Sequence, residues 1–169
     1  LWGNKYSKNN ALNNKLVTFG IKPNDANTDY GYIKFKDECN DGAHNIDKFI
    51  EKPNLKTAQT FLKQGKYLWN SGMFMFKANI LLDELTKYCP LISKATKASV
   101  ANASKDLDFI RLDEHSFSSC PNLSIDYALM EKSNNTVVVP LDVGWNDIGS
   151  WESLSRFGKK DVNGNIIEG

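Results

Sequence analysis

A single carboxylate, Asp147, stands between two tryptophans in the segment 143–151, shortly after an apolar run at residues 136–141. The run predicts a buried strand, the glycines around the carboxylate predict a tight loop, and a helix is expected to start at Ser150. Ligands of α/β proteins bind at such strand ends, where a carboxylate can ligate a hard cation such as Mg²⁺ or hold a hydroxyl group. Taken alone, an aspartate beside glycine is more often a turn residue or the cap of the following helix.

Two further segments carry groups that suit a polar, phosphorylated ligand. Gly31 lies between two tyrosines, and a glycine lets a ligand approach the backbone closely, although this motif alone favours a β-bulge or a strand-start glycine. Glu51 and Lys52 end an expected strand, where a carboxylate can accept hydrogen bonds from sugar hydroxyls and an ammonium can bind phosphate. Pro53 is expected to keep Lys52 extended. The alternative is a solvated strand end.

A third segment, residues 69–74, contains Asn70, which offers both a donor and an acceptor, and Gly72, which permits close backbone approach. These features suit a hydroxyl-rich ligand, and the alternative is a turn that connects two strands. The run 124–127 is expected to cap and pack a helix, and His115 has no partner in view. The sequence therefore supports no Ser/His/Asp or Cys/His catalytic group.

Hydrophobic periodicity places these segments on alternating strands and helices. Strands are expected at residues 15–20, 30–35, 45–50, 72–77 and 136–141, and helices at residues 55–64, 80–88, 92–104 and 124–133. Asn54 should cap the first of these helices and Gly65 should end it. Asn163-Gly164 predicts a hairpin turn, whereas residues 1–14 have no clear period and are expected to form an irregular loop or a frayed helix. The pattern predicts an α/β fold with a mixed sheet in a single domain over residues 1–169.

Bulk composition excludes several classes of protein. The 21 basic and 20 acidic residues give a formal net charge of +1, so no overall field favours nucleic acid or an anionic membrane. No apolar run approaches the roughly 20 residues that span a bilayer. Three widely spaced cysteines, Cys39, Cys89 and Cys120, form neither a zinc motif nor a disulfide framework, which predicts a reducing, cytoplasmic location. The sequence does not specify the oligomeric state and leaves a homo-oligomer open.

The order and spacing of these motifs are more specific than any one of them, and they resemble the mannose-1-phosphate guanylyltransferases. The resemblance runs from Leu16 to about Gly164 and is carried by residues 16–23, 28–33, 49–53, 69–74, 108–111, 124–132, 138–142 and 144–151. It implies the nucleotide-diphospho-sugar transferase fold, a three-layer α/β/α arrangement. This chain would form its C-terminal, sugar-phosphate-binding part.

The same resemblance implies a reaction and a set of residue roles. GTP and mannose 1-phosphate would give GDP-mannose and pyrophosphate, with in-line attack of the sugar phosphate on the α-phosphorus and Mg²⁺ neutralising charge. The backbone of Gly31 and the side chains of Glu51 and Asn70 would hold mannose hydroxyls. Lys52 would hold the sugar phosphate, and Asp147 would be one of two Mg²⁺ ligands, so these two would act in catalysis.

The chain departs from the family pattern in one large respect. The family's glycine-rich loop, its Arg-Leu-Trp-Pro and Pro-Lys-Gln segments and its other metal-binding aspartate have no counterpart here. We therefore expect the sugar-phosphate half of an enzyme, with no turnover by this segment alone. Two alternatives are a nucleotidyltransferase for another sugar 1-phosphate and a non-catalytic sugar-binding or regulatory module. The latter would stack sugars on Trp69, Trp145 or Trp151.

Overall fold

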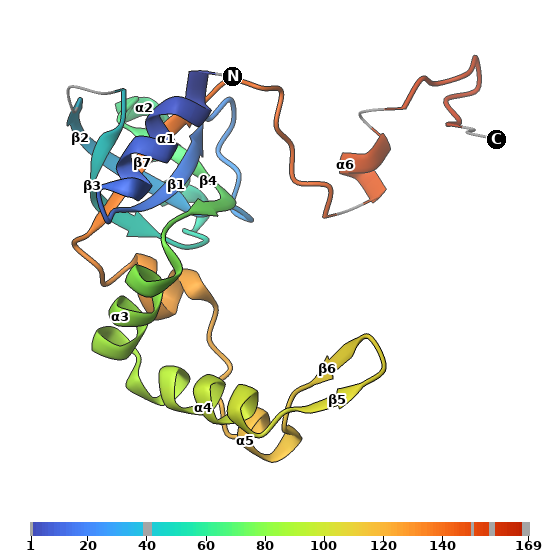
Figure 1. Cartoon of the computed structure of the whole chain (residues 1–169). Coiled ribbons are helices and arrows are strands. Elements are labelled where there is room, and N and C mark those ends of the chain that lie inside the picture. Colours follow the sequence, from blue (N-terminus) through green and yellow to red (C-terminus); the bar gives the residue numbers. More distant parts are fainter. Residues whose placement is uncertain (1, 39–41, 150, 156–157, 167–169) are drawn as a thin grey trace.

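Five strands close into a small barrel, from which a helical arm and a C-terminal segment project (Figure 1). The structure, a computed structural model, describes residues 2–38, 42–149, 151–155 and 158–166. In hydrogen-bonded order the barrel strands are β1 (Leu16–Ile21), β4 (Tyr67–Met75), β2 (Tyr32–Glu38), β3 (His44–Ile50) and β7 (Thr136–Leu141). Strands β1 and β7 run parallel and the other pairs are antiparallel, so the sheet is mixed.

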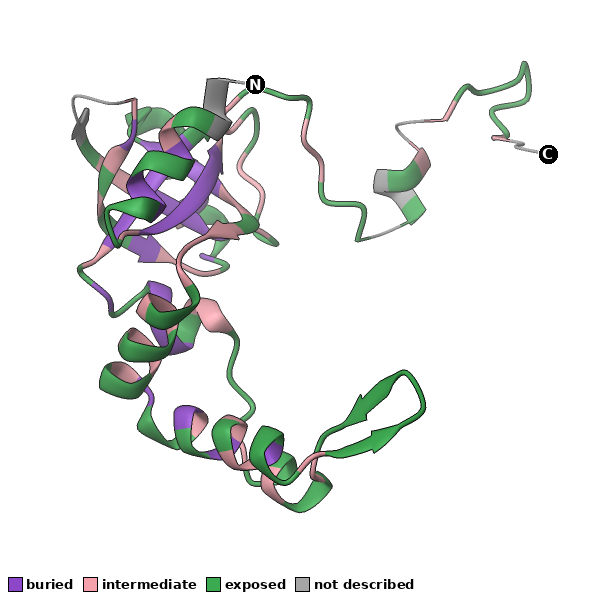
Figure 2. Cartoon of the chain, in the orientation of Figure 1, coloured by how far each residue is buried: buried purple, intermediate pink, exposed green. Residues whose placement is uncertain are grey.

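The parallel pair β1–β7 forms the centre of the core because both strands are almost continuously apolar, as strands buried on both faces must be. Val137 and Val139 pack with Val17 beneath a helix, whereas Val138 points the other way and packs with Leu68. This alternation follows the two-residue period of a strand. Figure 2 shows that buried residues concentrate in the barrel, while the arm and the C-terminal segment are largely exposed.

The helix α1 (Trp2–Leu12) covers β1 and β7, so of the two expectations for residues 1–14 the irregular loop was wrong and the segment is helical. Its buried residues are small or polar, namely Ser7, Asn10 and Ala11. The Nδ2 group of Asn10 donates a hydrogen bond to the carbonyl oxygen of Tyr6 at 3.0 Å. Because the helix packs through such side chains, its sequence lacks the periodic spacing of apolar residues that is typical of an amphipathic helix.

The hairpin of β2 and β3 and the helix α2 (Leu55–Gln64) confirm their predictions. The Asn54 side chain accepts a hydrogen bond from the backbone N–H of Thr57 at 2.9 Å, and Gly65 ends α2 with a left-handed φ of 65°. These are the capping interactions that the sequence predicts.

The strand β4 begins earlier than the predicted strand 72–77 and includes Asn70 in its interior. The alternative of a turn at residues 69–74 was therefore wrong. An extended strand here is consistent with its pairing to β1 on one side and, over Tyr67–Trp69, to β2 on the other.

The helical arm continues from β4 through α3 (Ala78–Tyr88) and α4 (Pro90–Ala101) to a hairpin of β5 (Ser104–Asp106) and β6 (Phe109–Arg111). After α5 (Glu114–Ser118), one π-helical turn, η1 (Asp126–Met130), returns the chain to the barrel, where Met130 joins the core. The hairpin was not predicted. The helix expected at residues 124–133 is this shorter π-helical turn.

The C-terminal segment leaves the barrel after β7 and carries the short helix α6 (Trp151–Ser155) (Figure 1). The predicted turn at Asn163 and Gly164 forms, because the Asp161 carboxylate accepts hydrogen bonds from the backbone N–H groups of Asn163 and Asn165. The expected hairpin does not, since residues 158–166 contain no strand.

The predicted α/β class with a mixed sheet is confirmed, but the three-layer arrangement is not formed by the part of the chain that the structure describes. The sheet closes where His44 and Asn45 of β3 pair with Val138 and Val137 of β7. A closed sheet encloses its own core and does not present two open faces to two helical layers.

No described helix has the length and apolar character needed to cross a membrane. Cys89 and Cys120 are free thiols, and Cys39 lies outside the described residues.

The α2 cap gives a direct test of the fold. We expect Asn54→Ala to lower the free energy of unfolding by about 1 kcal/mol, because one backbone N–H of the first helical turn loses its acceptor. Urea denaturation measures this difference. Asn54→Ser is the control, since its hydroxyl can cap the helix, and an equal loss in both variants would contradict the capping role.

Candidate active site

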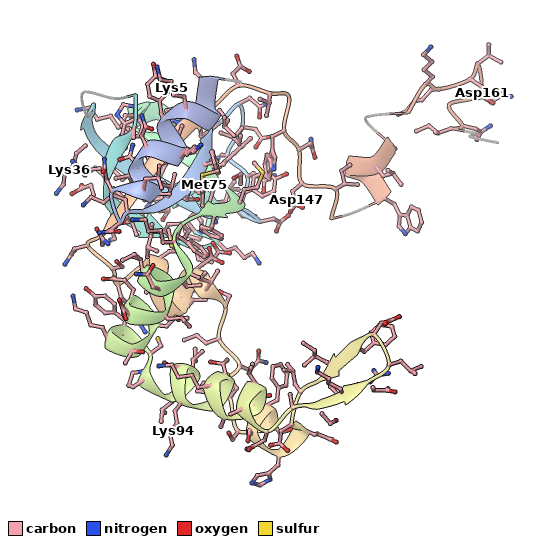
Figure 3. All side chains as sticks on the ribbon, viewed as in Figure 1. Lys5, Lys36, Met75, Lys94, Asp147 and Asp161 are labelled. Carbon is pink, nitrogen blue, oxygen red and sulfur yellow. The ribbon has the colours of Figure 1, made fainter. Side chains whose placement is uncertain are left out.

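A pocket of about 250 Å³ at the side of the barrel brings the five predicted site residues together. Its lining consists of Asp29, Tyr30, Gly31, Glu51, Lys52, Asn70, Ser71, Gly72, Asp126, Trp145 and Asp147. They come from the start of β2, the end of β3, the middle of β4, the η1 turn and the segment after β7. Figure 3 shows Asp147 beside the barrel, whereas Asp161 lies far out on the C-terminal segment.

Gly31 is buried directly before β2 and sets the close approach between two walls of the pocket. Its carbonyl oxygen accepts a hydrogen bond from the backbone N–H of Asn70 at 2.7 Å. A Cβ atom at this position would collide with the Glu51 carboxylate and touch Asn70. A side chain at this position would displace the Glu51 carboxylate from its present place, so the glycine keeps that carboxylate on the pocket wall. The strand-start interpretation is correct without excluding a role in binding.

The Glu51 side chain is largely buried, with 13% of its surface exposed, so a solvated strand end does not describe it. Burial raises the pKa of this carboxyl, and the nearby Asp126 carboxylate raises it further, whereas Lys52 opposes the shift. The Lys52 Nζ atom lies 3.8 Å from Glu51 Oε1, and the lysine side chain is 62% exposed. Glu51 therefore faces the pocket as an acceptor beside an accessible cation.

The backbone at Lys52 corrects one expectation. Pro53 was expected to keep Lys52 extended, but the residue has a φ of 45°, in the left-handed region. A non-glycine residue in that region costs on the order of 1–3 kcal/mol and persists where surrounding structure imposes it, often at functional sites. The bend turns the chain from β3 towards α2 while keeping both Glu51 and Lys52 on the pocket wall.

Both ends of the Asn70 amide are held by protein groups. Its Oδ1 atom accepts a hydrogen bond from Thr18 Oγ1 at 2.9 Å, and its Nδ2 group donates to Asp126 Oδ1 at 3.1 Å. No described residue takes the second Nδ2 hydrogen. Asn70 is thus oriented before any ligand arrives and has one donor left to offer.

Asp126 is the functional candidate that the sequence analysis missed, because the run 124–127 was interpreted as a helix cap. It lies at the start of the η1 turn, lines the pocket and contacts Asn70. Single π-helical turns are frequent at functional sites because they redirect one side chain. Its place in the run 124–132, one of those that resemble the guanylyltransferases, was the available signal.

Asp147 lies on the pocket wall with an exposed side chain that folds over Gly149. Trp145 holds this segment to the barrel by an edge-on contact with Tyr30, with ring centroids 5.5 Å apart. Trp151, by contrast, is 87% exposed and does not line the pocket. One of the two flanking tryptophans is therefore a wall of the site. Ser150, where a helix was expected to start, is outside the described residues.

The pocket residues can supply only part of the coordination of a metal ion. Among the described residues, no three or more His, Cys, Asp or Glu side chains are grouped as a metal site. Mg²⁺, however, is commonly held by one or two carboxylates together with substrate phosphates and water. An exposed Asp147 in the same pocket as Lys52 can supply one such carboxylate.

A larger cavity of about 640 Å³ shares Trp145 with this pocket but lacks its chemistry. Aromatic and aliphatic side chains such as Tyr67, Trp69 and Leu141 dominate its wall, and Lys22 and Asp142 are charged groups on it. The smaller pocket gathers carboxylates, an amide and an ammonium around one space, so it is the better candidate for binding a phosphorylated sugar.

The raised pKa of Glu51 predicts a pH-dependent contribution to stability. Because the folded protein holds the Glu51 proton more tightly than the unfolded chain, the free energy of unfolding should fall as pH rises from the unfolded pKa, near 4.5, through the folded one. Glu51→Gln should remove this fall and be more stable than the wild type at neutral pH. Urea denaturation between about pH 4 and 7 measures the free energy of unfolding of the wild type and the variant. Glu114→Gln, which replaces an exposed glutamate, is the control. A pH-independent difference between Glu51→Gln and the wild type would contradict it.

Comparison with known proteins identifies the family. A family model described as Nucleotidyl transferase matches residues 4–164. The mannose-1-phosphate guanylyltransferase of Salmonella montevideo is 51% identical over 162 residues, and the match covers 92% of this chain and 34% of that protein. A xanthan biosynthesis protein of Xanthomonas campestris is 50% identical over 159 residues, which cover 94% of this chain and 34% of the relative.

Two solved structures share the fold. A mannose-6-phosphate isomerase from Helicobacter pylori has a TM-score of 0.77 at 36% identity and covers 86% of this chain and 56% of that one. A mannose-1-phosphate geranyltransferase from Thermus thermophilus has a TM-score of 0.78 at 28% identity, with 91% and 43% covered. The chain spans about a third of the length of the curated relatives it matches. Since the family model covers nearly the whole sequence, the chain belongs to the nucleotidyl transferase family.

Proposed function

We propose that the chain forms the sugar-phosphate side of a mannose-1-phosphate guanylyltransferase, which converts GTP and mannose 1-phosphate into GDP-mannose and pyrophosphate. The observation that carries the proposal is that five residues from four separate segments of the chain line one pocket. Those residues are Gly31, Glu51, Lys52, Asn70 and Asp147. The names of the Salmonella relative and others of similar identity support the choice of mannose and guanosine.

In this proposal different residues of the pocket bind the sugar and the phosphate of the ligand. The Gly31 backbone, the Glu51 carboxylate and the free Asn70 donor bind mannose hydroxyls. Lys52 binds the sugar phosphate, because its ammonium is exposed at the pocket and Glu51 is its one ion-pairing partner among the described residues. The small volume of the pocket suits a single sugar phosphate and leaves the nucleotide outside it.

The chemistry needs positioning and charge neutralisation rather than a protein nucleophile. A phosphate oxygen of mannose 1-phosphate attacks the α-phosphorus of GTP, the bond to the β-phosphate oxygen breaks, and pyrophosphate leaves. Mg²⁺, when bound by Asp147 and phosphate oxygens, supplies neutralisation of the charge that develops on those oxygens. Lys52 holds the attacking phosphate in place, and the sugar-binding residues fix its direction.

The nucleotide-binding motif and the second metal ligand belong, in this proposal, to a part of the enzyme beyond the described residues. Strand β4 pairs with β2 only up to Trp69, so the rest of that edge has no strand partner among the described residues.

Of the alternatives, a nucleotidyltransferase for another sugar 1-phosphate uses the same pocket, and competition among sugar 1-phosphates decides between the two. A sugar-stacking module is less well supported. Trp69 is only 6% exposed and Trp151 does not line the pocket, which leaves Trp145 as the one tryptophan on its wall among the described residues.

Lys52→Ala tests the phosphate contact. We expect it to weaken mannose 1-phosphate binding about 10- to 100-fold, the effect of losing one charge-assisted hydrogen bond. Its effect on binding of mannose itself should be small. Isothermal titration calorimetry measures both affinities. Lys56→Ala, an exposed lysine on α2, is the matched control. Equal affinities for Lys52→Ala and the control would refute the assignment.

Asp147→Ala tests the metal contact. We expect Mg²⁺ to strengthen mannose 1-phosphate binding by the wild-type chain, and the variant to lose this enhancement because one carboxylate ligand is gone. Titrations with and without Mg²⁺ give the comparison, and Asp142→Ala, another exposed aspartate after β7, is the control. Sugar binding that is insensitive to Mg²⁺ in both wild type and variant would instead favour the non-catalytic module.

A further inference from the structure

Thr18 is a polar residue at the centre of the apolar strand β1, with no exposed surface. It does not line the pocket, yet its hydroxyl contacts a residue that does. The Oγ1 atom lies 2.9 Å from Asn70 Oδ1 and 3.3 Å from the carbonyl oxygen of Met73. A buried hydroxyl is unfavourable unless it is hydrogen-bonded. Both neighbours are acceptors and the hydroxyl has one hydrogen, so the shorter contact, to Asn70 Oδ1, is the main hydrogen bond that stabilises it in the core.

The two contacts lie on either side of a bulge in β4. Gly20 pairs with Asn70 and Thr18 pairs with Phe74, so β4 advances by more residues than β1 between these pairs. The extra chain passes through Gly72, which has a left-handed φ of 72°, and places Ser71 and Gly72 on the pocket wall. Bulges of this kind redirect side chains next to functional sites. Thr18 thus ties the bulge to the neighbouring strand.

The Thr18 hydroxyl and the Asp126 carboxylate together hold the Asn70 amide in one orientation. The oxygen and nitrogen ends of an asparagine amide have nearly the same shape, so packing alone does not distinguish them. The Asp126 carboxylate requires the Nδ2 donor on its side, and the amide oxygen then faces Thr18, whose hydroxyl donates to it and stabilises this orientation. With Nδ2 turned towards Asp126, the second Nδ2 hydrogen is available to an acceptor oxygen of a ligand.

We propose that Thr18 is a positioning residue for sugar recognition, which holds Asn70 as a hydrogen-bond donor towards a ligand hydroxyl oxygen. This inference rests on the proposed function, since it concerns the same pocket. Thr18 acts through Asn70 and the β4 bulge and does not touch the ligand itself.

Thr18→Val removes the hydroxyl at nearly constant volume. We expect it to raise the Kd for mannose 1-phosphate about five- to tenfold, the effect of losing one neutral hydrogen bond. The matched control is Thr136→Val. Thr136 is equally a buried threonine of the core, on β7, and its Oγ1 donates to the Ser133 carbonyl at 3.3 Å, away from the pocket. Titration calorimetry on the folded variants should show little change for this control.

A double-mutant cycle separates positioning from general destabilisation. In the Asn70→Ala background, Thr18→Val should have no further effect on affinity, because the residue it positions is gone. Additive losses in the cycle, or equal losses for Thr18→Val and Thr136→Val, would overturn the inference.

A second pair of variants covers the case in which Thr18→Val fails to fold. Thr18→Ser and Thr18→Ala both lack the γ-methyl group and differ in the hydroxyl, so Thr18→Ser should bind near wild-type affinity and Thr18→Ala should not. Equal affinity of this pair would also overturn the inference. Failure of the wild-type chain to bind mannose 1-phosphate at all would refute the proposed function instead.

Discussion

The parallel pairing of β1 with β7 is the constraint on which the rest of the structure depends. It runs in unbroken register from Leu16 opposite Thr136 to Ile21 opposite Leu141, so both strands end at the same edge of the barrel. The chain that leaves β1 leads to Gly31, and the chain that leaves β7 leads to Asp147. Residues more than a hundred positions apart therefore reach one pocket, and the contact between Tyr30 and Trp145 joins the two segments.

The pocket combines opposed charges in a way that suits a phosphorylated polyol. Burial disfavours ionisation of Glu51, and the Asp126 carboxylate nearby adds to this effect by raising the pKa further. Lys52 only partly compensates it, because its ammonium remains mostly exposed. A ligand that donates hydroxyl hydrogens to the carboxylates and brings an anionic group to the lysine would satisfy both sides.

Local signals in the sequence were reliable wherever a short segment determines its own conformation. The cap of α2 needs only Asn54 and Gly65, and both behave as predicted. The signals failed where distant contacts decide. Helix α1 has no apolar stripe because it packs through Ser7, Asn10 and Ala11, and Lys52 is left-handed although a proline follows it. In both cases tertiary packing outweighs the local preference.

The sequence by itself determined which residues are candidates for the site, since the types and order of Gly31, Glu51, Lys52, Asn70 and Asp147 already indicated a sugar-phosphate site. Only the tertiary structure decided how they are held. Asp126 becomes part of the site because a π-helical turn brings its carboxylate to the Asn70 amide. Thr18 contributes to the site because the bulge in β4 places the same amide within reach of the Thr18 hydroxyl. Such contacts depend on strand register and on the return of the helical arm to the barrel, which no local pattern encodes. The fold's closure into a barrel likewise follows from pairing between β3 and β7, two strands far apart in the chain.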